Sequence, residues 1–228
     1  MKNFLGKKLF FITAHPDDES YMAAGTIYKN YQMGGQNMLL CASWGEKGRS
    51  HLKKPFTISQ LKKLRAKELR RAGKFLHIKP VLNLALPDGK LRNYQKIIFK
   101  KGLAIANKHQ PEVIISFGPD GISGHLDHIT AGQVARQIAE KLRIPFVAVT
   151  LPPSITKKAL KWLATRRKAG HYIKSIIYKN PNMKIVIDGQ IKKRALKIHQ
   201  SQMDHKNAFT GFPAYAVKEL LKAEYFLG

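Results

Sequence analysis

Short apolar runs alternate along this chain with longer segments in which apolar side chains recur at helical spacing. The apolar runs cover about 8–14, 37–43, 80–86, 113–117 and 145–150. The segments of helical period between them cover 19–33, 58–76, 93–109 and about 128–142. This alternation predicts an α/β fold with a mostly parallel sheet and helices on both faces. In a doubly wound sheet of order 3-2-1-4-5, the first and fourth strands would be neighbours.

The sequence after residue 150 follows a different pattern. A basic amphipathic stretch at 156–169 precedes two β-like runs, 171–178 and 183–188, which flank Asn-Pro-Asn and predict a β-hairpin. Helices are expected at 189–201 and near 214–226. We therefore expect a single domain over residues 1–228, because this length suits one domain. Its core would cover about 8–150, and a C-terminal hairpin and helix extension, about 151–228, would form a cap.

The composition is ordinary for a globular protein except in its charge. Lys and Arg total 41 and Asp and Glu total 14, which gives a formal net charge of +27. Such a surface attracts polyanions, although basic residues spread over most of the chain also suit a purely solubilising role. The single cysteine, Cys41, excludes a disulfide within the chain and fits a reducing cytosol, so we expect a cytoplasmic protein. No apolar run approaches the ~20 residues of a membrane span.

An unusual cluster of polar residues follows the first apolar run directly. His15, Asp17, Asp18 and Glu19 place three carboxylates and an imidazole within five residues. Charges crowded in this way repel each other unless a cation or a dipole compensates them. A helix-capping role for Asp17, with Asp18 and Glu19 at the positive end of the helix dipole, is one interpretation. A divalent metal is the other, since His and Asp are ordinary zinc ligands.

A second cluster, His125, Asp127 and His128, follows the fourth apolar run. Taken alone, it would suit an N-cap at Asp127 with two surface histidines. In the proposed winding, however, the first and fourth strands are neighbours, and ligands bind at the carboxyl ends of such strands. Both clusters would then face one crevice, a coincidence that independent helix capping does not require.

The two clusters together predict a metal site. His15 and Asp18 are three residues apart across the start of a helix, and His128 arrives from the neighbouring strand end. Two imidazoles and one carboxylate with open positions for water are typical of a catalytic zinc. Fe²⁺ or Co²⁺ would suit the same ligands.

Three neighbouring side chains have predicted roles in hydrolysis of an amide or ester. Asp17 is the candidate general base for a metal-activated water. His125 is free to donate to a developing oxyanion or a leaving group. Asp127 is expected to orient an imidazole.

Six segments, in order, carry a resemblance to a known family. They are Ala14–Glu19 (AHPDDE), Gly45–Gly48 (GEKG), Arg65–Glu68 (RAKE), Leu86–Gly89 (LPDG), His125–His128 (HLDH) and Lys192–Gln202. This set resembles the PIG-L/LmbE-like family of N-acetylglucosaminyl deacetylases, over about residues 8–203.

The resemblance implies a Rossmann-like fold and zinc-dependent removal of an acyl group from an N-acylated amino sugar. It also implies the metal ligands and the base already named, makes Arg65 a substrate-contact candidate, and places Glu46 and Asp88 in the pocket. For Arg65 a solvated charge on a basic helix is an equal alternative, and Glu46 and Asp88 also suit turns. Two departures are notable. Leu126 replaces a commoner proline, and Ser123 stands where some members carry a tyrosine near the oxyanion.

The leading hypothesis is thus a zinc-dependent deacetylase acting on a small molecule or glycolipid that contains N-acetylglucosamine. A related amidase acting on a thiol conjugate or a non-sugar amide is the second hypothesis. The third is a basic module that binds nucleic acid or an anionic surface through segments 58–76 and 156–174. No aromatic series interleaves with the basic residues, so we expect no specific nucleic-acid partner. Association with an anionic membrane surface would suit a glycolipid substrate, and the sequence leaves the oligomeric state open.

Overall fold

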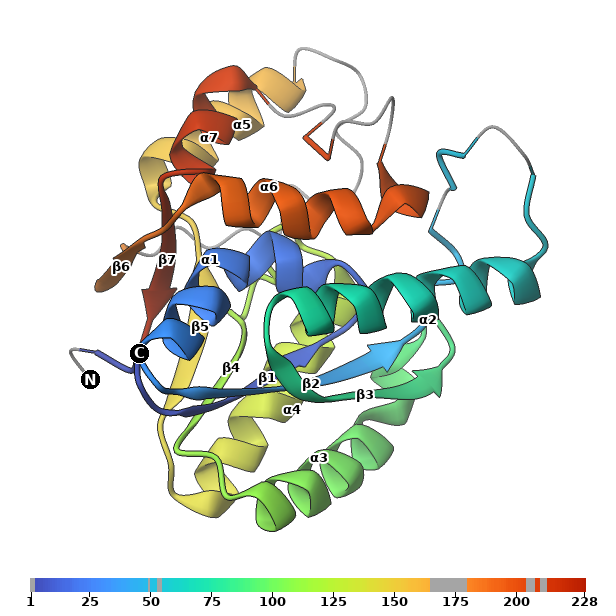
Figure 1. The fold of residues 1–228 in the computed structure, drawn as a ribbon, viewed down its shortest axis with the longest axis vertical. Coiled ribbons are helices and arrows are strands. Elements are labelled where there is room, and N and C mark those ends of the chain that lie inside the picture. The colour runs from blue at the N-terminus through green and yellow to red at the C-terminus, as the bar shows by residue number, and fades with distance from the viewer. Residues whose placement is uncertain (1–2, 49, 53–54, 165–179, 204–207, 210–212) are drawn as a thin grey trace.

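A central β-sheet organises the molecule. The computed structural model describes residues 3–48, 50–52, 55–164, 180–203, 208–209 and 213–228 (Figure 1). Within these residues the strands are β1 (Lys8–Thr13), β2 (Gln36–Ser43), β3 (Ile78–Leu86), β4 (Val113–Phe117), β5 (Phe146–Thr150), β6 (Met183–Val186) and β7 (Ala223–Leu227). They form one sheet in the order β3-β2-β1-β4-β5-β7-β6. The first five strands are parallel, which confirms the predicted α/β fold and the order 3-2-1-4-5.

Helices cover both faces of this sheet. They are α1 (Asp18–Gln32), α2 (Ile58–Phe75), α3 (Gln95–His109), α4 (Leu126–Leu142), α5 (Pro153–Ala164), α6 (Gly189–Ile198) and α7 (Ala214–Leu220), with 3₁₀ turns η1 (Leu91–Tyr94) and η3 (Gln200–Gln202). In Figure 1, α1, α2 and α6 lie on one face and α3 and α4 on the other. Among the described residues, no helix combines the length and apolar character needed to cross a bilayer.

Local sequence explains the central elements. The side chains of β1 after Lys8 are all buried, as expected for a strand with neighbours on both edges and helices on both faces. Helix α2 begins with a reciprocal capping box, in which Thr57 accepts from the Gln60 backbone N–H and Gln60 accepts from that of Thr57. The winding reverses between β2-β1 and β1-β4, so the crevice at the carboxyl ends of β1 and β4 is open to a ligand.

The C-terminal prediction needs one correction. The predicted helix near 214–226 ends at residue 220. Residues Ala223–Leu227 instead form β7, which pairs antiparallel with both β5 and β6. The second arm of the predicted hairpin is β6, whereas its first arm, 171–178, lies outside the described residues. The basic stretch at 156–169 begins within α5, which Pro153 opens, and proline is favoured at a first helical position.

Helix α1 is bent near its start. Ala23 departs from helical geometry, with φ −151° and ψ 20°. The backbone N–H groups of Gly25 and Thr26 donate to the carboxylate of Glu224 at 3.1 and 2.7 Å. The Nζ atom of Lys192 lies 3.0 Å from the same carboxylate, and both side chains are buried. Strand β7 and helix α6 therefore hold the bend in α1 through one buried ion pair.

Candidate metal centre and active site

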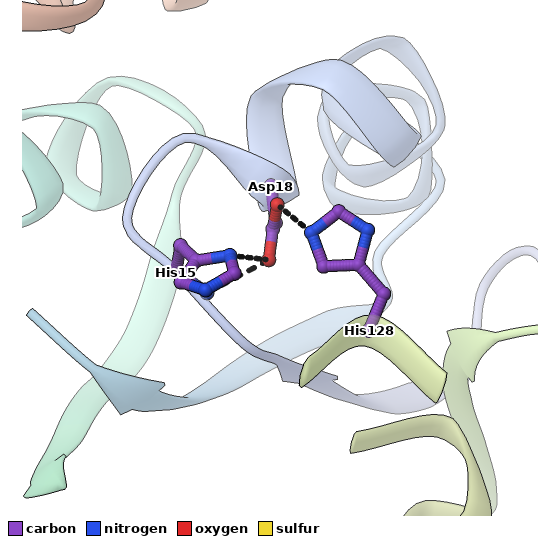
Figure 2. A group of neighbouring side chains, drawn as sticks. All are labelled: His15, Asp18 and His128. Atoms are coloured by element: carbon purple, nitrogen blue, oxygen red, sulfur yellow. Dashed lines mark hydrogen bonds and ion pairs between the residues drawn. The ribbon is translucent and has the colours of Figure 1, made fainter. Parts of the chain in front are cut away.

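Three side chains from the two sequence clusters converge at the carboxyl ends of β1 and β4. Asp18 lies between the imidazoles of His15 and His128 (Figure 2). Its Oδ1 atom is 3.2 Å from His128 Nε2, and its Oδ2 atom is 3.8 Å from His15 Nδ1. One candidate ligand atom from each residue falls within 4.8 Å of the others, a spacing that could hold a metal ion. The structure thus brings His15, Asp18 and His128 together, as the sequence predicted.

Hydrogen bonds fix the orientation of two of these side chains. Asp18 Oδ2 accepts from the backbone N–H groups of Ala14 and His15 at 3.0 and 2.8 Å, which directs Oδ1 toward His128. The Nδ1 atom of His128 lies 3.1 Å from the carbonyl oxygen of Gly121. Donation to that carbonyl places the proton on Nδ1 and leaves a lone pair on Nε2, as metal-binding histidines require.

His15 is held by two further carboxylates. Its Nε2 atom lies 3.1 Å from Asp88 Oδ1 and 3.3 Å from Asp127 Oδ2. Burial lowers the pKa of His15, but Asp127, Asp88 and Asp18 outweigh that effect and raise it to about 10. The carboxylates hold a proton on Nε2 and leave Nδ1 facing Asp18. Displacement of the Nδ1 proton by a metal would give the arrangement of a carboxylate–histidine–metal triad.

A second grouping, His15 with His125 and Asp127, also meets the spacing for a metal. Its donor atoms are already engaged, however. Asp127 accepts from the backbone N–H groups of Gly89 and Leu91 at 2.7 and 3.1 Å, and His125 Nδ1 accepts from the Asp127 N–H at 3.1 Å. The donor set of His15, Asp18 and His128 therefore fits a divalent metal better.

Electrostatics support this choice. With protonated imidazoles, burial raises the pKa of Asp18, yet the charges of His128 and His15 outweigh burial and hold the pKa well below its ordinary value. The carboxylate is therefore ionised, and a divalent cation that displaced the imidazole protons would take over their compensating charge.

Asp17 precedes α1 in a strained conformation. Its φ is 103°, in a region that residues other than glycine rarely adopt, and its side chain makes no capping hydrogen bond. Its carboxylate lies 3.4 Å from Arg65 Nη2, and its side chain is 15% exposed. Burial raises the pKa of Asp17 to about 6, although Arg65 opposes the shift. Asp17 therefore stands at the N-cap position, with Asp18 and Glu19 in the first turn as the capping interpretation expected, but its carboxylate faces Arg65 and does not cap α1.

Arg65 is buried rather than solvated. Its guanidinium donates to the carbonyl oxygens of Pro16, at 2.5 Å, and of Gly45. The side chain is 3% exposed, and its Nε has no partner within the described residues. Arg65 thus ties the loop after β1 to the loop after β2 and lies against Asp17.

His125 is the N-cap of α4. Because its Nδ1 accepts the Asp127 N–H, the neutral ring carries its proton on Nε2. Burial lowers the pKa of His125, and repulsion from His128 and His15 adds to this effect. The residue is therefore a neutral donor beside His15 and His128, and the alternative N-cap at Asp127 is wrong.

Glu46 and Asp88 line the same region. The backbone N–H of Asp88 donates to Glu46 Oε1 at 3.3 Å, and Lys62 Nζ lies 3.4 Å from that oxygen. Glu46 Oε2 is buried without a hydrogen-bond partner in the described part of the chain. Asp88 accepts from the Lys47 N–H at 2.9 Å as well as contacting His15. Asp88 thus orients the imidazole of His15, a contact that its place in a turn motif did not reveal.

Two buried carboxylates bind the late segment around η3 to the site. Glu19 Oε1 is 2.7 Å from His199 Nε2. Glu68 accepts from the backbone N–H and the hydroxyl of Ser201 at 2.8 and 2.6 Å. Sequence reasoning had not paired these residues, because no short spacing connects them.

Comparison with known proteins places this sequence among deacetylases. The family model for PIG-L, described as GlcNAc-PI de-N-acetylase, matches residues 10–139, more than half of the chain. A probable N-acetyl-alpha-D-glucosaminyl L-malate deacetylase 2 of Bacillus anthracis is 30% identical over 188 residues, covering 74% of this chain and 80% of that protein. A 1D-myo-inositol 2-acetamido-2-deoxy-alpha-D-glucopyranoside deacetylase of Corynebacterium diphtheriae is 24% identical over 174 residues, covering 67% of this chain and 59% of that protein.

Solved structures share the fold. N,N'-diacetylchitobiose deacetylase from Pyrococcus horikoshii superposes with a TM-score of 0.66 at 21% identity, covering 97% of this chain and 83% of that chain. GalB, a 4-carboxy-2-hydroxymuconate hydratase from Pseudomonas putida, gives a TM-score of 0.69 at 18% identity, covering 96% and 95%. The same fold therefore carries different reactions, and assignment depends on the matched sequence and the site. On the family match and the relatives of this sequence, the chain belongs to the PIG-L family of de-N-acetylases.

Proposed function

We propose that this chain is a metal-dependent hydrolase that removes the acetyl group from a small molecule containing N-acetylglucosamine. The observation that carries the proposal is the convergence of His15, Asp18 and His128, with partners that direct their donor atoms toward one another. The deacetylase names of the relatives support the class of substrate. A zinc ion at these ligands would supply Lewis acidity and a bound water of lowered pKa.

The remaining chemistry falls to side chains of this chain. Asp17, free of a capping bond and held beside Arg65, takes a proton from the attacking water. The water oxygen forms the new bond to the carbonyl carbon, the C–N bond breaks, and the amine leaves with a proton. His125, with its proton on Nε2, donates to the developing oxyanion or to that amine. Asp127 and Asp88 keep His15 in one orientation.

Glu46 is the best candidate for contact with the sugar. Its Oε2 atom is buried without a partner among the described residues, and a rotation of the side chain that exposed this oxygen would let a ligand hydroxyl satisfy it. Arg65 bonds to two backbone carbonyls and lies beside Asp17, so we propose that it positions the base and contacts substrate less than its motif implied.

The test combines metal analysis with amine release. Protein stripped by a chelator should bind one zinc per chain on reloading, and only the reloaded protein should release amine from N-acetylglucosamine derivatives. His128→Ala should lose zinc and activity, whereas His109→Ala, at the end of α3, should keep both. Amine release from a thiol conjugate or a non-sugar amide alone would favour the amidase hypothesis. If the protein bound no zinc and bound oligonucleotides with a steep salt dependence, the hypothesis of a basic binding module would be favoured over that of an enzyme.

A further inference from the structure

A cavity of about 200 Å³ adjoins two of the proposed metal ligands, Asp18 and His128. The start of α1, the carboxyl ends of β4 and β5, and strand β7 form its walls. Most of the lining is apolar and includes Met22, Phe117, Val149, Leu151, Leu220 and Ala223. The metal centre therefore opens onto an apolar space as well as onto the polar groups described above.

The charged groups on the cavity wall are paired with other protein groups. Lys192 and Glu224 lie 3.0 Å apart, and Glu224 accepts two further backbone N–H groups from α1. Asp18 accepts two backbone N–H groups and contacts His128. An apolar guest in the cavity would therefore not strip a charge of its partners, which would be costly.

The polar groups of the site lie apart from this apolar cavity. In the part of the chain that the structure describes, Asp17, His125 and Glu46 are not among the residues that line the cavity. The groups assigned to proton transfer and sugar contact thus lie outside the apolar space, and the metal ligands lie between the two. An amide whose carbonyl reached the metal would have its amine part on one side and its acyl part on the other.

The cavity is larger than an acetyl group needs. An engineered apolar cavity of about 150 Å³ in another protein binds benzene, a six-carbon guest. A cavity of about 200 Å³ therefore has room for a chain of about six carbons. Full burial of each methylene strengthens binding by up to about fourfold.

We propose, building on the proposed function, that this cavity receives the acyl chain of the substrate and favours linear acyl groups of about four to six carbons over acetyl. The reaction is the same amide hydrolysis as that proposed for the acetyl group. One water is consumed, the C–N bond breaks, and the products are the fatty acid and the free amine. The sugar side of the substrate is unchanged by this inference.

Kinetics on an acyl series provide the first test. Zinc-loaded protein is assayed for amine release from N-acetyl-, N-butanoyl- and N-hexanoylglucosamine. The inference expects kcat/KM for butanoyl and hexanoyl to exceed that for acetyl, and equal values would contradict it. Lower values for both longer chains, with acetyl hydrolysed, would overturn the acyl cavity and leave the proposed function standing.

A pair of variants locates the effect. Leu220, half-buried at the end of α7, lines the cavity, so Leu220→Trp should lower the hexanoyl-to-acetyl ratio at least tenfold. Ile97→Trp adds the same kind of bulk at a position on α3 that is 44% exposed, and should leave the ratio unchanged. An unchanged ratio in Leu220→Trp would count against the assignment of the cavity.

A binding measurement separates this inference from the deacetylase proposal. Acetohydroxamate and hexanohydroxamate share a zinc-chelating head and differ only in the chain. Calorimetric titration of zinc-loaded protein should show hexanohydroxamate binding at least tenfold more tightly, and Leu220→Trp should abolish that difference. Equal affinities would refute the acyl cavity whether or not any N-acylglucosamine is hydrolysed.

Discussion

The buried ion pair between Lys192 and Glu224 gives a prediction whose size follows from the structure. Lys192 Nζ lies 3.0 Å from Glu224 Oε1, and the two side chains are 2% and 1% exposed. Among the described residues, Lys192→Met would leave the buried Glu224 carboxylate with two backbone N–H donors and no cation. Breaking a buried pair in this way costs about 3–5 kcal/mol of the free energy of unfolding.

Urea unfolding followed by tryptophan fluorescence measures this loss. With an m value of about 2–3 kcal/mol per M, the midpoint of urea unfolding should fall by about 1–2.5 M. Lys222→Met is the matched control, because Lys222 pairs with Glu219 at 3.1 Å but the side chains are 57% and 39% exposed. Such surface pairs contribute about 0–1 kcal/mol.

A double variant tests the cause. Adding Glu224→Gln to Lys192→Met removes the uncompensated charge while keeping an acceptor for α1, so part of the lost stability should return. If Lys192→Met destabilised the protein no more than Lys222→Met, the pair would not hold the bend in α1, and the reasoning would be refuted.

Four further variants probe the site. Asp17→Asn should keep zinc by metal analysis and lose about 10²–10⁴-fold in kcat, since only the base is removed; full turnover would disprove the assignment. His15→Ala should lose both zinc and amine release, and retained zinc would exclude it as a ligand. Glu68→Gln should cost about 1–3 kcal/mol in urea unfolding, because it disturbs the buried bonds to Ser201. Leu126→Pro, at the first position of α4 with a residue 62% exposed, should change stability by less than about 0.5 kcal/mol and leave kcat unchanged.

The parallel part of the fold could be predicted because local pattern and topology agree there. Each run that became β1 to β5 is short, apolar and followed by a helical segment, and the winding rules leave few orders for such units. The same order then predicted that the clusters at His15 and His128 would meet. These clusters meet because β1 and β4 are neighbours in the sheet, so their contact could be predicted although they are far apart in sequence.

The C-terminal part was harder to predict for a physical reason. Residues 223–227 continue a helical stretch with a short apolar run, and periodicity alone does not separate helix from strand in such a run. Lys192 and Glu224 are residue types that usually face water, so nothing local indicated a buried pair. The strained backbone of Asp17 was also hidden, because it follows from the junction between β1 and α1 rather than from residue type.

The position of β7 has a consequence for how the molecule is made. This strand lies inside the sheet, between β5 and β6, although its residues are translated after every other strand. All three proposed metal ligands have been synthesised by residue 128, whereas the fixed bend of α1 and the closed wall of the cavity must wait for residues 223–227. A growing chain would therefore possess its metal-binding groups long before the compartment beside them takes its final shape.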